Sequence, residues 1–307
     1  MNIRNVPRYA TACCRALLTS GPLSYLKLLS KSPYTVKELP QFGVSMIVDV
    51  RDPAISKPIL ALGEYEPAFT QVFLALARKS THFLDVGANI GFFTLLAAKQ
   101  MTEGRIWSVE PDPTNVRILR ANIALNGLED IVNVSHAAAS DTDGEVYFSS
   151  LGYDANIGAR FTANDEDVLL ARSLPDSPAP TRVRALAADT LLRDQSIDLV
   201  KIDVEGHEPS VFAGMHRILK EDRPIILSEF APGTIQHISK VDPSEYLNSL
   251  SLHKYVFAVI EHDGQVTAAG NSTEDVLSRY AAEGEHHIDL ILLPEEKANR
   301  VAGTDRE

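Results

Sequence analysis

The chain of 307 residues contains 45% hydrophobic and 23% charged residues, a composition that is typical of a folded globular protein and excludes a largely disordered chain. Its 29 Lys and Arg residues are outnumbered by 41 Asp and Glu residues, which gives a net charge of −12 at pH 7. A surface of this sign repels phosphate backbones, so we expect no nucleic-acid partner.

Residues 1–40 are expected to form a basic helical arm. Residues 1–37 contain no acidic residue and carry Arg4, Arg8, Arg15, Lys27, Lys31 and Lys37. The favoured interpretation is a helical pair that covers one end of a sheet, and the alternatives are a presequence and an amphipathic helix on an anionic membrane surface. No apolar run reaches the ~20 residues that span a bilayer.

The two cysteines, Cys13 and Cys14, are neighbours, which suits neither a disulfide framework nor a tetrahedral metal site. We therefore expect a cytoplasmic protein, with peripheral membrane contact through residues 1–37 as an alternative.

Residues 41–80 are predicted to form a hairpin and a helix that precede the main domain. Apolar runs at 44–50 and 55–61 flank a turn at Asp52 and Pro53, which is typical of two paired strands. Residues 65–78 then place apolar side chains at helical spacing.

Residues 81–295 alternate strands and helices, which predicts an α/β domain built on a parallel sheet with helices on both faces. The predicted parallel strands are 82–86, 105–109, 131–135, 197–203 and 224–229, and runs at 255–261 and 288–293 are predicted to close the sheet as antiparallel strands. Residues 144–149 are predicted to be a returning strand. Residues 150–184 are acidic and broken by prolines, which indicates a lid or acceptor loop, or simply a solvated surface loop. Residues 296–307 are expected to be a tail.

A glycine-containing turn ends the first strand of this domain, where Asp85, Gly87 and Gly91 lie within seven residues. Glycine allows a ligand close to the backbone, and Gly91 opens a helix whose N–H groups point at that ligand. Glu110 ends the next strand, where its carboxylate can accept two hydrogen bonds from a ribose diol. The dinucleotide fingerprint requires glycine at position 89, and Asn89 stands there, so a nicotinamide-dependent oxidoreductase is the less favoured alternative.

A second constellation follows the strand at 197–203. Asp203, Glu205, His207 and Glu208 lie within six residues, immediately before a helix that starts at Pro209. Such a density of polar side chains at a strand end indicates a functional site. For Glu208 we prefer a structural role at the start of that helix.

Four stretches together resemble the FkbM family of methyltransferases: residues 63–67 (GEYEP), 85–91 (DVGANIG), 109–111 (VEP) and 197–208 (IDLVKIDVEGHE). The resemblance runs from about residue 45 to about residue 232. It implies a Rossmann-like class I methyltransferase fold with a mostly parallel seven-stranded sheet. It also implies S-adenosylmethionine as methyl donor and an acceptor hydroxyl on a sugar, a glycan or glycolipid, or a secondary metabolite. The alternative within this resemblance is a non-catalytic module that binds the donor alone.

On this interpretation the predicted donor-binding residues are Glu66, Asp85, Gly87, Ala88, Asn89, Gly91, Glu110, Pro111, Asp141 and Asp203. For Asp141 a simple hairpin turn explains the sequence equally well. His207 is the predicted general base, Asp203 would hold either the base or the methionine part of the donor, and Glu205 would orient the acceptor. Asp203 and Glu229 could bind a divalent metal ion, but no sequence motif fixes a metal site, so metal dependence stays open.

Overall fold

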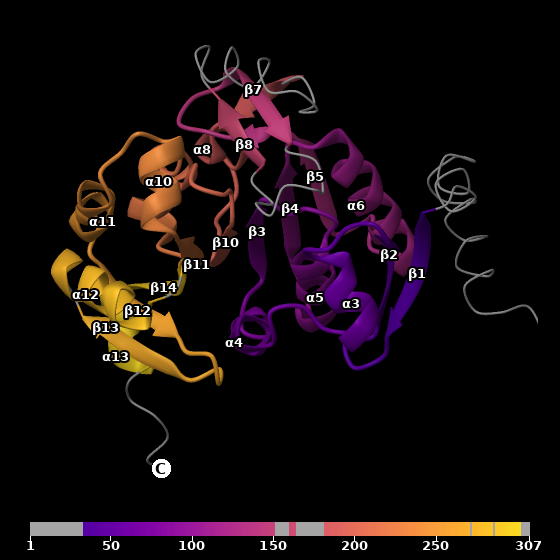
Figure 1. Ribbon diagram of the computed structural model, residues 1–307, viewed down its shortest axis with the longest axis horizontal. Helices are drawn as coiled ribbons and strands as arrows, with labels where there is room; N and C mark the ends of the chain where they lie inside the picture. Colours follow the sequence, from indigo (N-terminus) through magenta and orange to yellow (C-terminus); the bar gives the residue numbers. More distant parts are fainter. Residues whose placement is uncertain (1–32, 151–159, 164–180, 271, 285, 302–307) are drawn as a thin grey trace, which may run out of the picture.

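The computed structural model describes residues 33–150, 160–163, 181–270, 272–284 and 286–301 (Figure 1). The predicted arm over residues 1–32 and most of the predicted insertion lie outside these described residues. The features below concern the described parts of the chain.

One eight-stranded sheet organises the domain, in the strand order β13-β12-β14-β11-β10-β3-β4-β5 (Figure 1). The five strands from β11 to β5 run parallel, and β14, β12 and β13 are antiparallel to their neighbours. This arrangement confirms the predicted fold class, with one strand more than the seven expected, because β13 extends the sheet beyond β12. The strands are β3 (His82–Val86), β4 (Arg105–Glu110), β5 (Val132–His136), β10 (Leu199–Ile202), β11 (Ile225–Phe230), β12 (Tyr255–Ile260), β13 (Val266–Gly270) and β14 (Ile288–Pro294).

Helices cover both faces of this sheet, as strands with buried apolar side chains on both faces require. On one face, Phe83 and Leu199 of the sheet pack with α4 (Pro67–Ala77), α5 (Phe92–Gln100) and α6 (Pro113–Asn126). On the other face the sheet residues Leu84 and Val200 belong to a second core. That core includes residues of α8 (Ala188–Leu191), α9 (Glu208–Ala213), a π-helical turn (Ile218–Asp222), α10 (Pro232–Ile238), α11 (Pro243–Leu252) and α12 (Thr273–Glu283).

The N-terminal hairpin differs from the prediction. It pairs β1 (Tyr34–Leu39) with β2 (Val44–Asp49), and the predicted second strand is the helix α3 (Ser56–Leu62). The physical reason is local, because the Asp52 carboxylate accepts hydrogen bonds from the backbone N–H groups of Ala54 and Ser56, and Gly63 ends the helix at φ 78°. Residues 34–39, predicted to be part of the arm, therefore belong to the hairpin.

A second, four-stranded sheet of order β6-β9-β7-β8 lies beyond one end of the main sheet (Figure 1). Its strands are β6 (Ala138–Ala139), β7 (Gly144–Ser150), β8 (Arg160–Ala163) and β9 (Thr181–Leu186). The returning strand at 144–149 is thus confirmed. The described parts of the predicted irregular segment at 150–184 form strands that pair with β7. The predicted tail begins as the helix α13 (Glu295–Val301).

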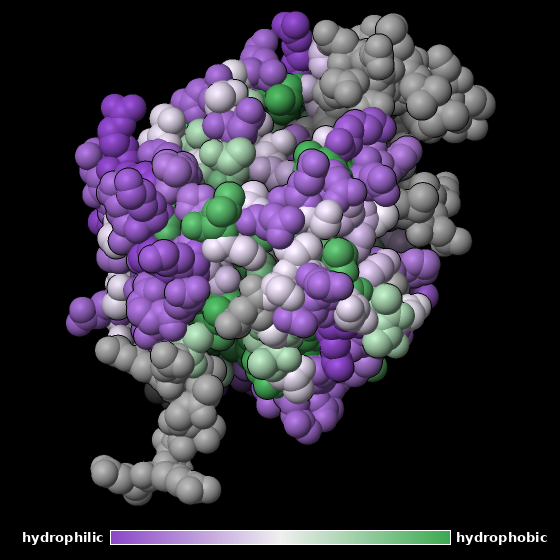
Figure 2. Space-filling view, turned by 90° about the vertical axis from the view of Figure 1, so that its left-hand side faces the viewer, coloured by the Kyte–Doolittle hydropathy of each residue, from purple (hydrophilic) through white to green (hydrophobic). Residues whose placement is uncertain are grey.

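The face formed by the C-terminal elements is largely hydrophilic, with apolar residues in scattered patches (Figure 2). Large exposed apolar side chains of the described residues are Val50, Leu62, Leu252 and Val266. No helix of the described chain combines the length and the apolar character that crossing a membrane requires.

Candidate functional site

The turn after β3 brings the ends of two neighbouring parallel strands into contact. Gly87 has φ 76°, and a Cβ atom built on it would lie 1.9 Å from the backbone oxygen of Asp203, at the end of β10. Gly91 has φ 94° and forms the N-cap of α5. Only glycine fits at position 87, because both the backbone conformation and the approach of Asp203 exclude a side chain.

Asn89 stands where the dinucleotide fingerprint has glycine, and its conformation explains why it is tolerated. Its φ is 50°, in the left-handed region that Asn adopts more readily than most residues. The Asn89 side-chain oxygen accepts the backbone N–H of Ile90 at 2.9 Å. The departure from glycine therefore preserves the turn.

Glu110 lies at the end of β4 and is only 3% exposed. One carboxylate oxygen accepts the backbone N–H of Asn89 at 2.9 Å, and the other accepts the N–H of Asp112 at 2.9 Å and the Asn115 amide at 3.3 Å. Glu110, which we predict to bind the ribose, therefore also joins the glycine turn to the start of α6.

We expect Glu110→Ala to lower the free energy of unfolding by about 1–3 kcal/mol, because buried N–H donors at Asn89 and Asp112 lose their acceptor. Donor affinity should fall in the same variant. Chemical denaturation and calorimetric titration with S-adenosylmethionine would measure the two effects. Glu110→Gln, which retains an acceptor oxygen, is the matched control and should show smaller losses of both.

Asp85 lies deeper than the prediction of a strand-tip ligand implied. It is 0% exposed, and one oxygen accepts the Thr94 hydroxyl at 2.6 Å, which in turn contacts the Ser108 hydroxyl at 2.8 Å. Burial raises the pKa of Asp85 above its ordinary value, although the nearby Lys201 ammonium opposes that rise. The carboxyl group fixes the first turn of α5 to β3, and its role in donor binding stays a prediction.

Asn122 is a site-supporting residue that the sequence reasoning missed. Its side chain is 0% exposed, accepts the N–H of Ile47 at 2.6 Å and donates to the carbonyl of Ile90 at 2.8 Å. It therefore ties α6 to the hairpin strand β2 and to the glycine turn. A polar residue on the buried side of an amphipathic helix is the sequence signal that could have found it.

Asp203, the predicted residue at the end of β10, is held by Lys201 from the same strand. The ammonium lies 3.0 Å from the Asp203 carboxylate, and the side chains of Lys201 and Asp203 are 3% and 30% exposed. Lys201 also lies 5.1 Å from the Phe93 ring centroid. Burial lowers the pKa of Lys201 and the surrounding carboxylates raise it, with a net rise. Lys201 therefore stays charged and pairs with the Asp203 carboxylate.

Further carboxyl groups from separate elements surround Asp203. Glu66, the N-cap of α4 at φ 44°, interacts electrostatically with Asp203, as do Glu229 of β11 and Asp289 of β14. Glu66 is exposed, and partial loss of water around its carboxylate together with the Asp203 charge raises its pKa to about 7. The structure thus brings the predicted residues Glu66 and Asp203 together, and adds Asp289, which the sequence reasoning had not identified.

The loop between β10 and α9 is shaped by Glu208. Its carboxylate accepts the backbone N–H groups of Val204 and Gly206 at 3.3 and 3.2 Å. Burial raises the pKa of Glu208 to about 7. These bonds hold Glu205 at φ 51° and Gly206 at φ 92°. The structural role preferred for Glu208 agrees with this geometry, and the predicted role of Glu205 in orienting the acceptor stays a prediction.

His207 forms the N-cap of α9 and is half-buried. Burial lowers its pKa to about 4, and Asp141 partly opposes this shift. Among the described residues, nothing hydrogen-bonds to its buried Nε2 atom. Asp141 itself accepts hydroxyl groups from its neighbours Ser140 and Thr142 in an exposed turn. The structure therefore places Asp141 near His207, and the turn interpretation accounts for its local contacts.

Pro111 presents its backbone oxygen to His136 Nε2 at 3.0 Å, on the rim of the Glu110 site. Within the described residues, no group of three or more His, Cys, Asp or Glu side chains has an arrangement that could hold a metal ion. Ala88 is 5% exposed and donates its N–H to the backbone oxygen of Val109 at 3.1 Å.

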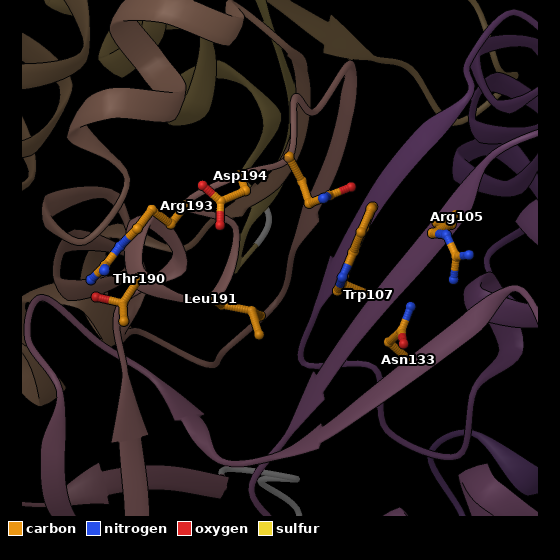
Figure 3. Close-up of a pocket in the computed structure, with 8 residues that line it drawn as sticks. Arg105, Trp107, Asn133, Thr190, Leu191, Arg193 and Asp194 are labelled. Atoms are coloured by element: carbon orange, nitrogen blue, oxygen red, sulfur yellow. The ribbon is translucent and has the colours of Figure 1, made fainter.

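A pocket of about 760 Å³ is lined by residues of β4, β5 and the segment that follows β9, and no residue of the glycine turn lines it (Figure 3). Trp107 and Asn133 of β4 and β5 lie on one side of it, and Leu191 and Asp194 of the segment that follows β9 lie on the other. The predicted site residues do not line this pocket. The pocket is therefore separate from the predicted donor site.

Known proteins match this chain over the region that contains the predicted site residues from Asp85 to Glu208. Residues 85–264 match the model of the methyltransferase FkbM domain. The chain is 29% identical over 153 residues to the 31-O-demethyl-FK506 methyltransferase FkbM of Streptomyces tacrolimicus. This match covers 43% of this chain and 58% of the length of that protein. It is 27% identical over 185 residues to methyltransferase sdnD of Sordaria araneosa. This second match covers 53% of this chain and 71% of the length of that protein.

Among solved structures, a methyltransferase FkbM from Methylobacillus flagellatus KT shares 15% identity at a TM-score of 0.40, over 94% of this chain and 59% of that chain. An O-methyltransferase from Bacillus cereus in complex with SAH shares 13% identity at a TM-score of 0.40, over 92% and 97% of the two chains. The domain match spans more than half of the chain, including the glycine turn, Glu110 and the Asp203–Glu208 loop. The chain therefore belongs to the FkbM domain family of S-adenosylmethionine-dependent methyltransferases.

Proposed function

We propose that this protein transfers the methyl group of S-adenosylmethionine to a hydroxyl group of a small molecule or a glycan. The observation that carries the proposal is the glycine turn, in which Gly87 lies against the end of β10 within the matched domain. The relative from Streptomyces tacrolimicus, whose name specifies a 31-O-demethyl acceptor, supports oxygen as the accepting atom.

The residues at the turn fit the donor. A Cβ atom at Gly87 would collide with the backbone oxygen of Asp203, so position 87 has no side chain where the two strand ends meet. Gly91 opens α5, whose first N–H groups can face the carboxylate of the donor. Glu110 would accept the ribose hydroxyls, and the carboxyl groups near Asp203 suit the donor's positive charges. S-adenosylmethionine, when bound, supplies a methyl group on a positively charged sulfur.

The chain must align the acceptor oxygen with this methyl group and remove the hydroxyl proton as the new bond forms. We propose His207 as the proton acceptor and Glu205 as the residue that orients the hydroxyl. With a pKa of about 4, His207 is neutral across the working range, and its buried Nε2 has no hydrogen-bond partner among the described residues. Its low basicity limits the rate gain, so alignment of the acceptor has to supply most of the effect.

The test of the proposed function is transfer of a labelled methyl group to a panel of sugars, glycolipids and secondary metabolites, with donor binding measured by calorimetry. Labelled product together with donor binding would support it. Binding without transfer to any acceptor would instead favour a non-catalytic module. Stabilisation by a nicotinamide cofactor, with no response to S-adenosylmethionine, would favour the oxidoreductase alternative.

We expect His207→Ala to lower kcat by at most about 100-fold, the low end for a general base because its basicity is low, with little change in donor affinity. The wild-type kcat, measured at saturating donor, should stay constant between pH 5 and 8 and decline only as the pH approaches 4, because His207 becomes protonated there. A pH–rate profile measures this. An acid limb near pH 6.5 that persists in His207→Ala would contradict the assignment. His253→Ala is the matched control, since His253 also has a lowered pKa but lies at the end of α11.

A further inference from the structure

The pocket of about 760 Å³ lies at the β5 end of the main sheet, on the face opposite to α5 and α6 (Figure 3). β5 is the last strand of the sheet, and its side chains alternate between the two faces. Val132 and Val134 pack with α5 and α6, so Asn133 points to the other face, where it is in register with Trp107 of β4. Asn133 is exposed and offers a covering helix no apolar surface to bury. This end of the sheet therefore borders a pocket.

The opposite wall of the pocket is held in place by the core and by one arginine. Ala188 and Leu192 are buried in the second core, which fixes the short helix α8 and the residues that follow it. The Arg217 side chain donates to the backbone oxygens of Leu192 and Gln195 at 3.0 and 3.3 Å. Another nitrogen of this guanidinium donates to Asp222 at 3.0 Å. The wall is therefore preformed, which lowers the entropic cost of ordering it around a ligand.

Trp107 is the aromatic side chain of this pocket and the only tryptophan of the chain. It is 8% exposed, and the centroids of its ring and the His82 ring are 5.8 Å apart. The indole group is thus packed on the sheet and borders the pocket with a fixed part of its surface. Such a surface suits the C–H side of a pyranose ring, because the contact buries apolar area without requiring the side chain to move.

Two arginines face the pocket from opposite sides. Arg105 lies on the side of β4, and Arg193 lies on the side of the segment that follows β9 (Figure 3). Both residues are exposed, and neither side chain has a hydrogen bond or an ion pair with another residue that the structure describes. Among the described residues of the lining, Asp194 carries the only negative charge. The lining is thus positive in a chain of net charge −12, which indicates an anionic ligand.

The remaining lining residues indicate an anion that is rich in hydroxyl groups. Trp107 and Leu191 are the only apolar residues in the described lining, which is too little apolar surface for a lipid or polyketide ligand. The amides of Asn133 and Gln195 each donate and accept hydrogen bonds, as sugar hydroxyl groups do. A guanidinium can bind a carboxylate through two parallel N–H donors. Hydroxyl groups, a ring with an apolar side and a carboxylate occur together in hexuronic acids.

We propose that this pocket is a binding site for an acidic saccharide, in which Arg105 and Arg193 bind carboxylates and Trp107 packs against a sugar ring of hexuronic-acid units. The inference goes beyond the proposed function and does not depend on it, because the pocket contains none of the predicted donor-binding residues. The saccharide and S-adenosylmethionine should therefore bind independently of each other.

Tryptophan fluorescence of the full chain tests the inference, because the tryptophan emission comes from Trp107 alone. We expect digalacturonate to change this emission in a saturable way, with a dissociation constant of about 1 mM or tighter. Galactobiose, its neutral counterpart, should bind at least about tenfold more weakly, and added salt should weaken the binding of digalacturonate alone. Saturating S-adenosylmethionine should leave the dissociation constant of digalacturonate unchanged.

Arg105→Gln and Arg193→Gln should each raise the dissociation constant of digalacturonate at least about tenfold, because each removes a charged donor. Both positions are exposed, so we expect both variants to fold as the wild type does. Arg120→Gln is the matched control, because it removes the same charge from an exposed position on α6, which packs on the opposite face of the sheet. This control should leave the affinity unchanged.

No change of emission and no heat of binding with digalacturonate would overturn the inference. Equal affinity for galactobiose, or wild-type affinity in both arginine variants of the pocket, would overturn the role of the two guanidinium groups. Tighter binding of uridine monophosphate than of digalacturonate would show a nucleotide site instead. Competition with S-adenosylmethionine would overturn the separation of the two sites. The proposed function is tested separately, by donor binding and methyl transfer, so its failure is distinguishable from each of these results.

Discussion

Replacing Gly87 by alanine should abolish measurable donor binding, with a loss of affinity of about 100-fold or more. The new Cβ atom would lie 1.9 Å from the backbone oxygen of Asp203, and the φ of 76° adds about 1–2 kcal/mol of strain for any L side chain. The turn must shift by more than an ångström to relieve this contact, which displaces the backbone where we propose that the donor binds. Calorimetric titration with S-adenosylmethionine measures the loss, and thermal unfolding measures the accompanying destabilisation.

The matched control is Gly127→Ala. Gly127 ends α6 with φ 66°, and nothing lies within 4 Å of a Cβ atom built there. This variant has the same backbone penalty without the collision, so its stability should fall by about 1–2 kcal/mol while donor affinity stays unchanged. Wild-type affinity in Gly87→Ala would show that the donor does not use this turn.

Lys201→Met should be the most destabilising substitution at the site, lowering the free energy of unfolding by about 3–5 kcal/mol at pH 8. The ammonium is 3.0 Å from the Asp203 carboxylate and also offsets the charge of Asp85 and Glu66. Without it, these carboxyls lose their opposite charge, and the pKa values of Asp85 and Glu66, which burial already raises, rise further. The loss should therefore shrink as the pH falls through those values, because the carboxyls become neutral. Urea denaturation at pH 8 and pH 5 measures this difference.

The double variant Lys201→Met with Asp203→Asn supplies the control for charge. It removes both members of the ion pair, so part of the lost stability should return at pH 8. A Lys201→Met protein as stable at pH 8 as the wild type, or a loss that is the same at both pH values, would refute an electrostatic role for Lys201.

The helix boundaries around the turn could be predicted because their causes are local. Asp112 accepts the N–H groups of Thr114 and Asn115 at the start of α6, and Gly127 ends that helix in the left-handed conformation. The apolar strand runs were equally readable, since strands buried on both faces need continuous apolar sequence. The segment at 55–61 shows the limit of such patterns, because the side chain of Asp52 converts an apolar run into the helix α3.

The parallel sheet, the glycine turn and the nature of the donor could be predicted from the sequence, because each prediction depends on patterns of residues close together in the chain. The sequence could not show that Glu66, Asp203, Glu229 and Asp289 interact with one another, that Lys201 is their permanent counter-charge, or that Asn122 holds the turn from α6. These relations depend on strand order and register, which join residues far apart in the chain and leave no local periodicity to read. The charge of the site and the pKa values of its carboxyl groups therefore depend on which strand ends the fold brings together.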